Sequence, residues 1–282
     1  MKIVSWNIQW CLGLDGRVDP QRIVDEARAF ADFDVLCLQE VACNFPALKG
    51  SAGEDQFALI AERLPGFTAI RGIAVDTPAP DGSRRLFGNM ILSRLPVRQA
   101  TRVQLPWPCD PTLRSMPRML LEAVLQAPFG LLRLMTTHLE YYSALQREAQ
   151  VDGVRARHAE ASEHARRDQA IDTSEGPFHS MQQTTSAVLT GDFNCRTSDG
   201  AYERMTAPFD ERASPFDDAW TVLHPGVAHA PTVGVHDHEQ WPEPFTCDFV
   251  FTSRDLRPRL RAIAVDGSTS ASDHQPVMLE LV

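Results

Sequence analysis

The sequence predicts an α/β fold in which two packed β-sheets are flanked by helices. Its first residues follow a strand–helix–strand pattern, and the rest of the chain contains many short apolar strand runs with few helices between them. Many strands with few interspersed helices favour two sheets packed together. We find no internal repeat and no second apolar core, and we therefore expect one domain over residues 1–282.

The first half of the chain supplies most of the predicted strands. Asp19-Pro20 predicts the start of a helix, because aspartate caps helices and proline fits their first turn. We expect a second helix over 55–64. Short apolar runs bounded by polar residues predict strands over 2–8, 34–39, 67–75, 87–93, 97–104, 118–126 and 131–138.

The second half begins with a longer helix. Ser143 followed by Gln146 resembles a capping box and predicts a helix that includes Val154. Large apolar residues become sparse over 155–185, so we expect a solvated helical extension followed by a loop, with histidines such as His158 facing water. Further strands are expected over 186–191, 246–252, 257–265 and 276–282, the third being an edge strand with arginines on its solvent face.

Composition limits the classes of function. The net charge is −10 and the pI is about 5.4, which argues against broad affinity for polyphosphate backbones but leaves room for a small phosphate site. No apolar run is long enough to predict a membrane span, and the N-terminus enters a predicted strand at once, so we expect no signal peptide. The six scattered cysteines include no CxxC pair. We expect a reduced, cytoplasmic monomer.

Short polar side chains, namely carboxylates, carboxamides and imidazoles, recur where the predicted strands end or begin. They are Asn7, Glu40, His138, Asp192, Asn194, Asp248, Asp273 and His274. Any one of them has a structural explanation, such as capping a turn or making a buried hydrogen bond. Their number and shared position favour a metal-assisted hydrolytic site instead.

The stretches around these residues resemble, in order, the motifs of the endonuclease/exonuclease/phosphatase superfamily. The matching stretches are Ser5-Trp6-Asn7-Ile8, Leu38-Gln39-Glu40, Gly88-Asn89-Met90-Ile91-Leu92-Ser93, Thr137-His138-Leu139, Gly191-Asp192-Phe193-Asn194, Asp248-Phe249-Val250 and Ser272-Asp273-His274. Each motif is weak by itself, but their common order along the whole chain is a strong signal. The resemblance implies a four-layer α/β sandwich with the site at one edge of the two sheets.

The resemblance also implies a divalent metal, Mg²⁺ or Mn²⁺, at the site. Glu40 would be its principal ligand, and Asn7 and Asp273 would either contact the ion or hold its ligands. Asp192 would orient or deprotonate the attacking water, or else hold a second cation. Asn194 would donate a hydrogen bond to a phosphate oxygen.

Two histidines complete the implied site. His274 would contact the phosphate and would be oriented by Asp248 through its other ring nitrogen. His138 would stabilise the phosphate or protonate the leaving oxygen. Asn89 would support the site from its strand.

The chain departs from the repair endonucleases of this superfamily at one position. Those proteins often carry arginine two residues before the aspartate that corresponds to Asp248, whereas this chain has Thr246. Arg118 either supplies a positive charge near the site or is an exposed arginine at a strand start. Trp241 and Phe245 form either one wall of a substrate pocket or a packed loop.

We therefore predict a metal-dependent phosphoesterase that attacks a phosphodiester or phosphomonoester with an activated water. Nucleic acid is one candidate substrate, and a small-molecule or lipid-headgroup phosphodiester is another. The alternative from a different class is a non-catalytic binding or scaffold protein of the same fold. Such a protein would be expected to lose several site residues, and here they are all present.

Overall fold

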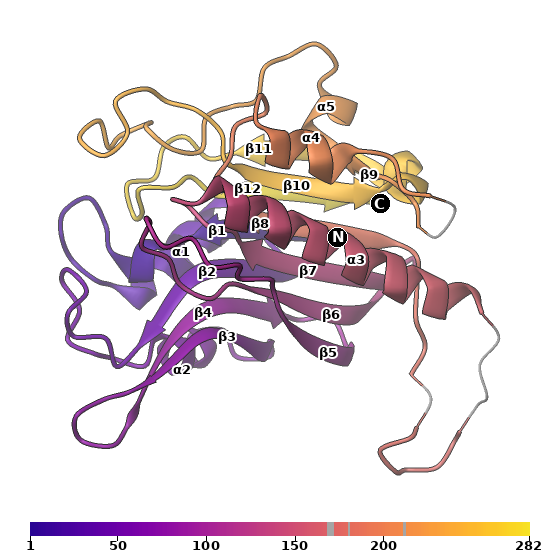
Figure 1. Ribbon diagram of the computed structural model, residues 1–282, viewed down its shortest axis with the longest axis horizontal. Coiled ribbons are helices and arrows are strands. Elements are labelled where there is room, and N and C mark those ends of the chain that lie inside the picture. The colour runs from indigo at the N-terminus through magenta and orange to yellow at the C-terminus, as the bar shows by residue number, and fades with distance from the viewer. Residues whose placement is uncertain (168–171, 180, 211–212) are drawn as a thin grey trace.

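The computed structural model describes residues 1–167, 172–179, 181–210 and 213–282. In this structure the chain forms two mixed six-stranded sheets flanked by helices, which confirms the predicted fold class (Figure 1). The indigo loops near the N-terminus and the yellow loops near the C-terminus lie together at the left of Figure 1, at one edge of the sheets. That edge carries the candidate site.

The first sheet combines both ends of the chain. In spatial order its strands are β11 (Leu260–Val265), β12 (Val277–Leu281), β1 (Lys2–Asn7), β2 (Val35–Cys43), β4 (Arg84–Ser93) and β3 (Thr68–Pro78). β1 and β2 pair in parallel because α1 (Pro20–Phe30) connects them, and the other neighbours are antiparallel.

The second sheet is built from the middle of the chain. In spatial order its strands are β5 (Val97–Gln104), β6 (Met119–Ala127), β7 (Gly130–His138), β8 (Ala187–Asp192), β10 (Asp248–Ser253) and β9 (Phe216–Asp218). β7 and β8 are its one parallel pair among the described residues, and they are joined by the long helix α3 (Ala144–Arg166).

Apolar side chains are buried in three layers. The cluster between the sheets includes Ile3 and Cys37 from the first sheet and Leu121 and Leu134 from the second. A second cluster packs α1 and α2 (Gln56–Glu62) on the outer face of the first sheet. A third packs α3 and α4 (Gly200–Thr206) on the outer face of the second sheet. Helix, sheet, sheet and helix therefore stack as the four predicted layers.

The predicted helix starts are confirmed by their caps. The Asp19 side chain accepts hydrogen bonds from the amides of Gln21 and Arg22 at the start of α1. Ser143 caps α3 by accepting from the amide of Gln146. In the described part of the chain, four short helices were not predicted: α4, α5 (Ala219–Leu223), η1 (Gln9–Cys11) and η2 (Arg254–Arg259).

Three sequence predictions need correction. β2 does not end near Glu40 but continues to Cys43 through a bulge between Leu38 and Val41. The predicted strand over 257–265 begins only at Leu260, because η2 occupies the residues before it. The third correction concerns the helical extension after residue 155, which is less solvated than predicted.

α3 continues to Arg166, as the predicted extension requires, but part of that extension is buried. His158 is fully buried and stacks on Phe216, where water was expected. The reason is tertiary: this turn of α3 packs on the second sheet beside Arg133. Residues 168–171 and 180 of the predicted 155–185 segment lie outside the described residues.

None of the helices in the described part of the chain combines the length and the apolar character that crossing a membrane requires.

Candidate active site

The predicted site residues converge because of strand register. In the second sheet Asp192 pairs with His138 on one side and with Asp248 on the other, so three strand ends meet at one point. Asn7 ends β1 in the first sheet, and its Nδ2 donates to Oδ2 of Asp192 at 2.9 Å. A hydrogen bond between the sheets thus joins residues 185 positions apart in sequence.

Asp192 lies at the centre of the site and is 1% exposed. Its Oδ2 lies 3.4 Å from Nε2 of His138 and 3.8 Å from Nε2 of His274. Its Oδ1 accepts the amide hydrogen of Asn194 at 2.9 Å, and Asn194 adopts a left-handed backbone with φ of 49°. Burial raises the pKa of Asp192 to about 6, while protonated His274 opposes the rise.

Glu40 approaches the same point from the first sheet. It sits on the β2 bulge with φ of 60°, and a bulge redirects a side chain in this way. Its Oε1 accepts from Nδ2 of Asn7 at 3.2 Å and lies 3.8 Å from Nδ1 of His138. Burial, followed by the charge of Asp273, raises the pKa of Glu40 to about 7.

His274 is held by Asp248, as the motifs implied. Its Nδ1 lies 2.9 Å from Oδ2 of Asp248, and its backbone oxygen accepts from the indole of Trp6. Burial alone would lower the pKa of His274, but the carboxylates of Asp248, Asp273 and Asp192 raise it well above its ordinary value. The ring therefore carries a proton, with Nε2 directed toward Asp192.

Asp273 lines the same cavity as Glu40, and its side chain is buried. Its Oδ2 accepts from Nε2 of Gln240 at 3.3 Å and from Nε1 of Trp241 at 3.5 Å. Burial raises the pKa of Asp273, and the charge of His274 opposes that rise. Trp241 thus forms part of the pocket wall, which resolves one of the alternatives left open by the sequence.

The pKa of His138 is shifted in the opposite direction to that of His274. Burial, the nearby Arg118 guanidinium and His274 together lower the pKa of His138 well below its ordinary value. The imidazole is therefore neutral at pH 7.

Arg118 is buried beside the site, and it is not an exposed arginine at a strand start. Its side chain is 7% exposed, and its Nε donates to Oε2 of Glu140 at 3.3 Å. Within the described residues, its Nη1 has no hydrogen-bond partner, and the side chain lines the same cavity as Asp192. Glu140 was given no role from the sequence, although it lies two residues after His138 at the end of a predicted strand, and in the structure its carboxylate positions this cation.

The two asparagines predicted to support the site have different positions. Asn194 borders the cavity, but its Nδ2 already donates to the backbone oxygen of Leu139 at 2.9 Å. Asn89 does not join the central cluster. It donates to the backbone oxygen of Met119 and borders a smaller space beside His138 and Arg118.

The donor set at the site fits a hard divalent cation. Glu40, Asp192 and Asp273 place carboxylates around one cavity, and burial raises the pKa of each. Buried carboxylates with raised pKa values favour a nearby cation, and Mg²⁺ or Mn²⁺ prefers such oxygen ligands. The oxygen of Asn7 accepts from the Gln9 amide, so its amide group orients the two carboxylates.

A softer metal fits the site less well. Ligand atoms of Asp192, Cys247 and His274 do lie within 4.8 Å of one another. However, burial raises the pKa of the Cys247 thiol well above its ordinary value, and that thiol donates to Asp248. A thiol must lose its proton to bind a metal, so the carboxylates form the better site.

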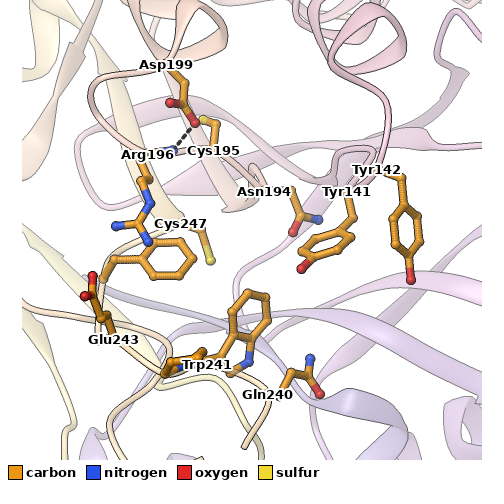
Figure 2. A pocket seen from close by; sticks show the side chains of 12 residues that line it. Tyr141, Tyr142, Asn194, Cys195, Arg196, Asp199, Gln240, Trp241, Glu243 and Cys247 are labelled. Atoms are coloured by element: carbon orange, nitrogen blue, oxygen red, sulfur yellow. Dashed lines mark hydrogen bonds between the residues drawn. The ribbon is translucent and has the colours of Figure 1, made fainter. Parts of the chain in front are cut away.

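The cavity beside Asp192 has a volume of about 580 Å³. An adjoining pocket of about 650 Å³ shares Tyr141, Tyr142, Asn194, Gln240 and Trp241 with it (Figure 2). Phe245 lines this second pocket, so it also belongs to a pocket wall. The space available is therefore larger than a phosphate group requires.

The fold has counterparts among solved structures. An endonuclease/exonuclease/phosphatase from Beutenbergia cavernae is 24% identical, with a TM-score of 0.68 over 100% of this chain and 71% of its own. A mannosyl-6-phosphatase from Bacteroides thetaiotaomicron is 17% identical, with a TM-score of 0.65 over 100% of this chain and 99% of its own. D. rerio TDP2 with a single-strand DNA product is 20% identical, with a TM-score of 0.63 over 99% and 97%.

No curated protein matches this chain in sequence. A model of the endonuclease/exonuclease/phosphatase family, however, matches residues 4–274. That span contains all of the strand-end motifs, in the order in which the structure brings them together. The chain therefore belongs to the endonuclease/exonuclease/phosphatase family, as the motif resemblance predicted.

Proposed function

We propose that this protein is a divalent-metal-dependent phosphoesterase that hydrolyses its substrate with an activated water. The observation that carries the proposal is the convergence of Asn7, His138 and His274 on the buried carboxylate of Asp192, with Glu40 beside them. Family membership supports it. Two proteins of similar fold are described as a phosphatase and as a complex with a DNA product, which supports chemistry at phosphate.

Glu40 and Asp273 would hold the metal, with Asn7 keeping Glu40 and Asp192 in place. When bound, the cation would neutralise phosphate charge and lower the pKa of a coordinated water. It would also lower the pKa values of the carboxylates around it.

Asp192 is placed to accept a proton from the attacking water. Its Oδ1 is held by the Asn194 amide, and its Oδ2 faces the cavity with the Asn7 amide and both histidine rings around it. A positioned carboxylate in this setting orients the water and takes its proton as the bond to phosphorus forms.

The cationic groups are placed to stabilise the negative charge that develops on phosphate. His274 presents Nε2–H, because Asp248 occupies the Nδ1 side of the ring. Arg118 presents Nη1, which has no hydrogen-bond partner among the described residues, from the side of Glu140. His138 is neutral, so we assign it hydrogen bonding to a phosphate oxygen and not donation of a proton to the leaving group.

The test is hydrolysis by the wild-type protein and by Asp192→Asn, which keeps the shape of the side chain and removes its charge. A panel of phosphate esters would contain an abasic duplex, single-stranded DNA, bis-p-nitrophenyl phosphate, sphingomyelin and an inositol phosphate. We expect Mg²⁺- or Mn²⁺-dependent turnover of at least one compound, abolished by chelator. Loss of a catalytic base should lower kcat by about 10²- to 10⁴-fold in Asp192→Asn.

The control is Asp76→Asn, which removes a carboxylate from an exposed ion pair with Arg84 on the β3–β4 hairpin. This variant should retain wild-type kcat. Full activity in Asp192→Asn would contradict the assigned role. Absence of turnover throughout, together with absence of metal binding, would favour the scaffold alternative.

A further inference from the structure

We infer that the pocket beside the catalytic cavity is a subsite for a planar aromatic substituent of the phosphate ester, such as a nucleobase or an aryl ring. The inference rests on the proposed function and specifies the class of its substrate. The pocket is continuous with the catalytic cavity through the residues they share, among them Asn194 and Trp241. A phosphate beside Asp192 would place one of its substituents at this opening.

Aromatic side chains form the walls of this subsite. Tyr141 contacts Trp241 edge to face at 5.9 Å between ring centroids, and Trp241 contacts Phe245 at 5.6 Å. In Figure 2 Tyr141 and Trp241 border the open centre from two sides, and the Arg196 side chain borders it on a third. Rings arranged around an open space offer both faces and edges to another ring.

Arg196 adds a cation to the same wall. Its guanidinium lies 3.8 Å from the centroid of Phe245, and its backbone amide is held by Asp199. Arginine stacked on an aromatic ring continues a flat surface on which a base or aryl group can stack.

The charges of the pocket favour a neutral ring over a second phosphate group. Asp199 and Glu243 also line the pocket, so two carboxylates offset the single guanidinium of Arg196. The net charge of −10 acts in the same direction. The polar groups suited to phosphate, His274 and Arg118, lie in the catalytic cavity instead.

The experiment compares two ligands that differ only in aromaticity. Benzylphosphonate and cyclohexylmethylphosphonate have similar size, and neither can be hydrolysed as an ester. Their dissociation constants would be measured by titration calorimetry with Mg²⁺ present, which requires no turnover. We expect benzylphosphonate to bind about tenfold more tightly, as one stacked ring contributes.

Substitutions in the pocket then test whether the ring of benzylphosphonate binds there. Phe245→Leu keeps apolar volume and removes the aromatic face under Arg196. The preference for benzylphosphonate over cyclohexylmethylphosphonate should therefore fall to about twofold or less. The matched control is Phe129→Leu, because Phe129 lies under Arg259 in the same arrangement, at 4.6 Å, beside the opposite end of β7 from His138. This control should keep the tenfold preference. Tyr141→Leu provides a second test if Phe245→Leu does not fold.

Equal affinities in the wild-type protein, or no binding of either ligand, would overturn the inference. So would an equal loss of preference in Phe129→Leu and Phe245→Leu. A thymidine 5′-phosphonate added to the series distinguishes the two sources of the ring, since tighter binding than benzylphosphonate identifies a nucleobase and weaker binding an aryl group. Equal ligand affinities combined with active hydrolysis would remove this inference and leave the proposed function standing.

Discussion

His138 and His274 both lie close to Oδ2 of Asp192, yet the pKa of His138 is lowered and that of His274 is raised. His274 faces three carboxylates, which outweigh burial and raise its pKa, whereas His138 has Arg118 beside it and its pKa falls. Both residues look alike in sequence, as histidines at strand ends. Their different pKa values follow from neighbours contributed by other segments of the chain, so the sequence predicted that both histidines belong to the site but not their protonation.

His158 shows the same effect away from the site. Its Nδ1 accepts from Nη2 of Arg133 at 2.5 Å, and its Nε2 donates to the backbone oxygen of Ser214 at 2.9 Å. Burial, followed by the charge of Arg133, lowers its pKa from 6.5 to about 3. The folded protein therefore holds the imidazole neutral where the unfolded chain would protonate it.

Because His158 is neutral in the folded protein and protonated in the unfolded chain, we expect the protein to lose stability in acid. Between pH 6.5 and about 3 the unfolded state binds one more proton than the folded state. The contribution of His158 to the free energy of unfolding is therefore complete above pH 6.5 and is lost as the pH falls toward 3. Its share of the slope is at most about 1.4 kcal/mol per pH unit. Urea unfolding at pH 7, 6, 5 and 4 should show a shallower pH dependence in His158→Gln than in the wild-type protein.

The control for this slope is His236→Gln, at an exposed loop position. It should reproduce the wild-type pH dependence. The same slope in His158→Gln and wild type would show that the buried imidazole is not the source of acid sensitivity.

At the scale of single elements, β8 depends on a glycine directly before Asp192. Gly191 has φ of 145°, and a Cβ there would lie 2.0 Å from the backbone oxygen of Thr137 in β7. Only glycine allows the two parallel strands to approach this closely, and their register places Asp192 beside His138.

We expect Gly191→Ala to lower the free energy of unfolding by about 3 kcal/mol or more, because backbone strain and a clash with a neighbouring strand combine. The residue beside it is Asp192, so kcat should fall as well. Gly130→Ala is the matched control: its φ is 126°, but a Cβ there meets no atom of the described residues within 4 Å. Thermal unfolding should show a loss of only about 1 kcal/mol for this control. Similar losses in both variants would mean that strand approach is not the constraint.

The apolar run of β2 predicts a strand but neither the bulge in it nor the residue at which it ends. The sequence predicts a strand that ends near Glu40, whereas the strand bulges there and continues to Cys43. Its pairing with β4 on both sides of the bulge determines this, and such pairing depends on residues about 50 positions later. The bulge directs Glu40 into the site, so its function was predictable although its local geometry was not.

At the scale of the whole molecule, the site is assembled from both sheets. Glu40 comes from the first sheet and Asp192 from the second. Asp273 lies just before β12, which belongs to the first sheet. Their carboxylates face one cavity, so their repulsion opposes the packing of the sheets at this edge. A bound cation would relieve that repulsion.

Metal binding should therefore stabilise the fold as a whole. At a concentration of Mg²⁺ or Mn²⁺ one hundred times the dissociation constant, we expect about 2.7 kcal/mol of added stability. For a chain of this size that corresponds to a rise of about 5 °C in Tm relative to the protein in chelator. Calorimetry measures this without any substrate.

Glu40→Gln should lose most of this rise, because it removes the principal predicted ligand. Glu62→Gln, at the exposed end of α2, should keep it. An undiminished rise in Glu40→Gln would place the cation elsewhere.

The sequence by itself determined the two-sheet architecture, the capped helices and the set of polar residues at strand ends, because periodicity, caps and short motifs are local properties. Only the tertiary structure decided that Arg118 is buried beside the site, that His158 is neutral in the core, and that Tyr141 and Trp241 form one pocket wall. These features arise between segments far apart in the chain. Their physical cause is strand register and sheet packing, which set the burial and the neighbouring charges that no single stretch of sequence contains.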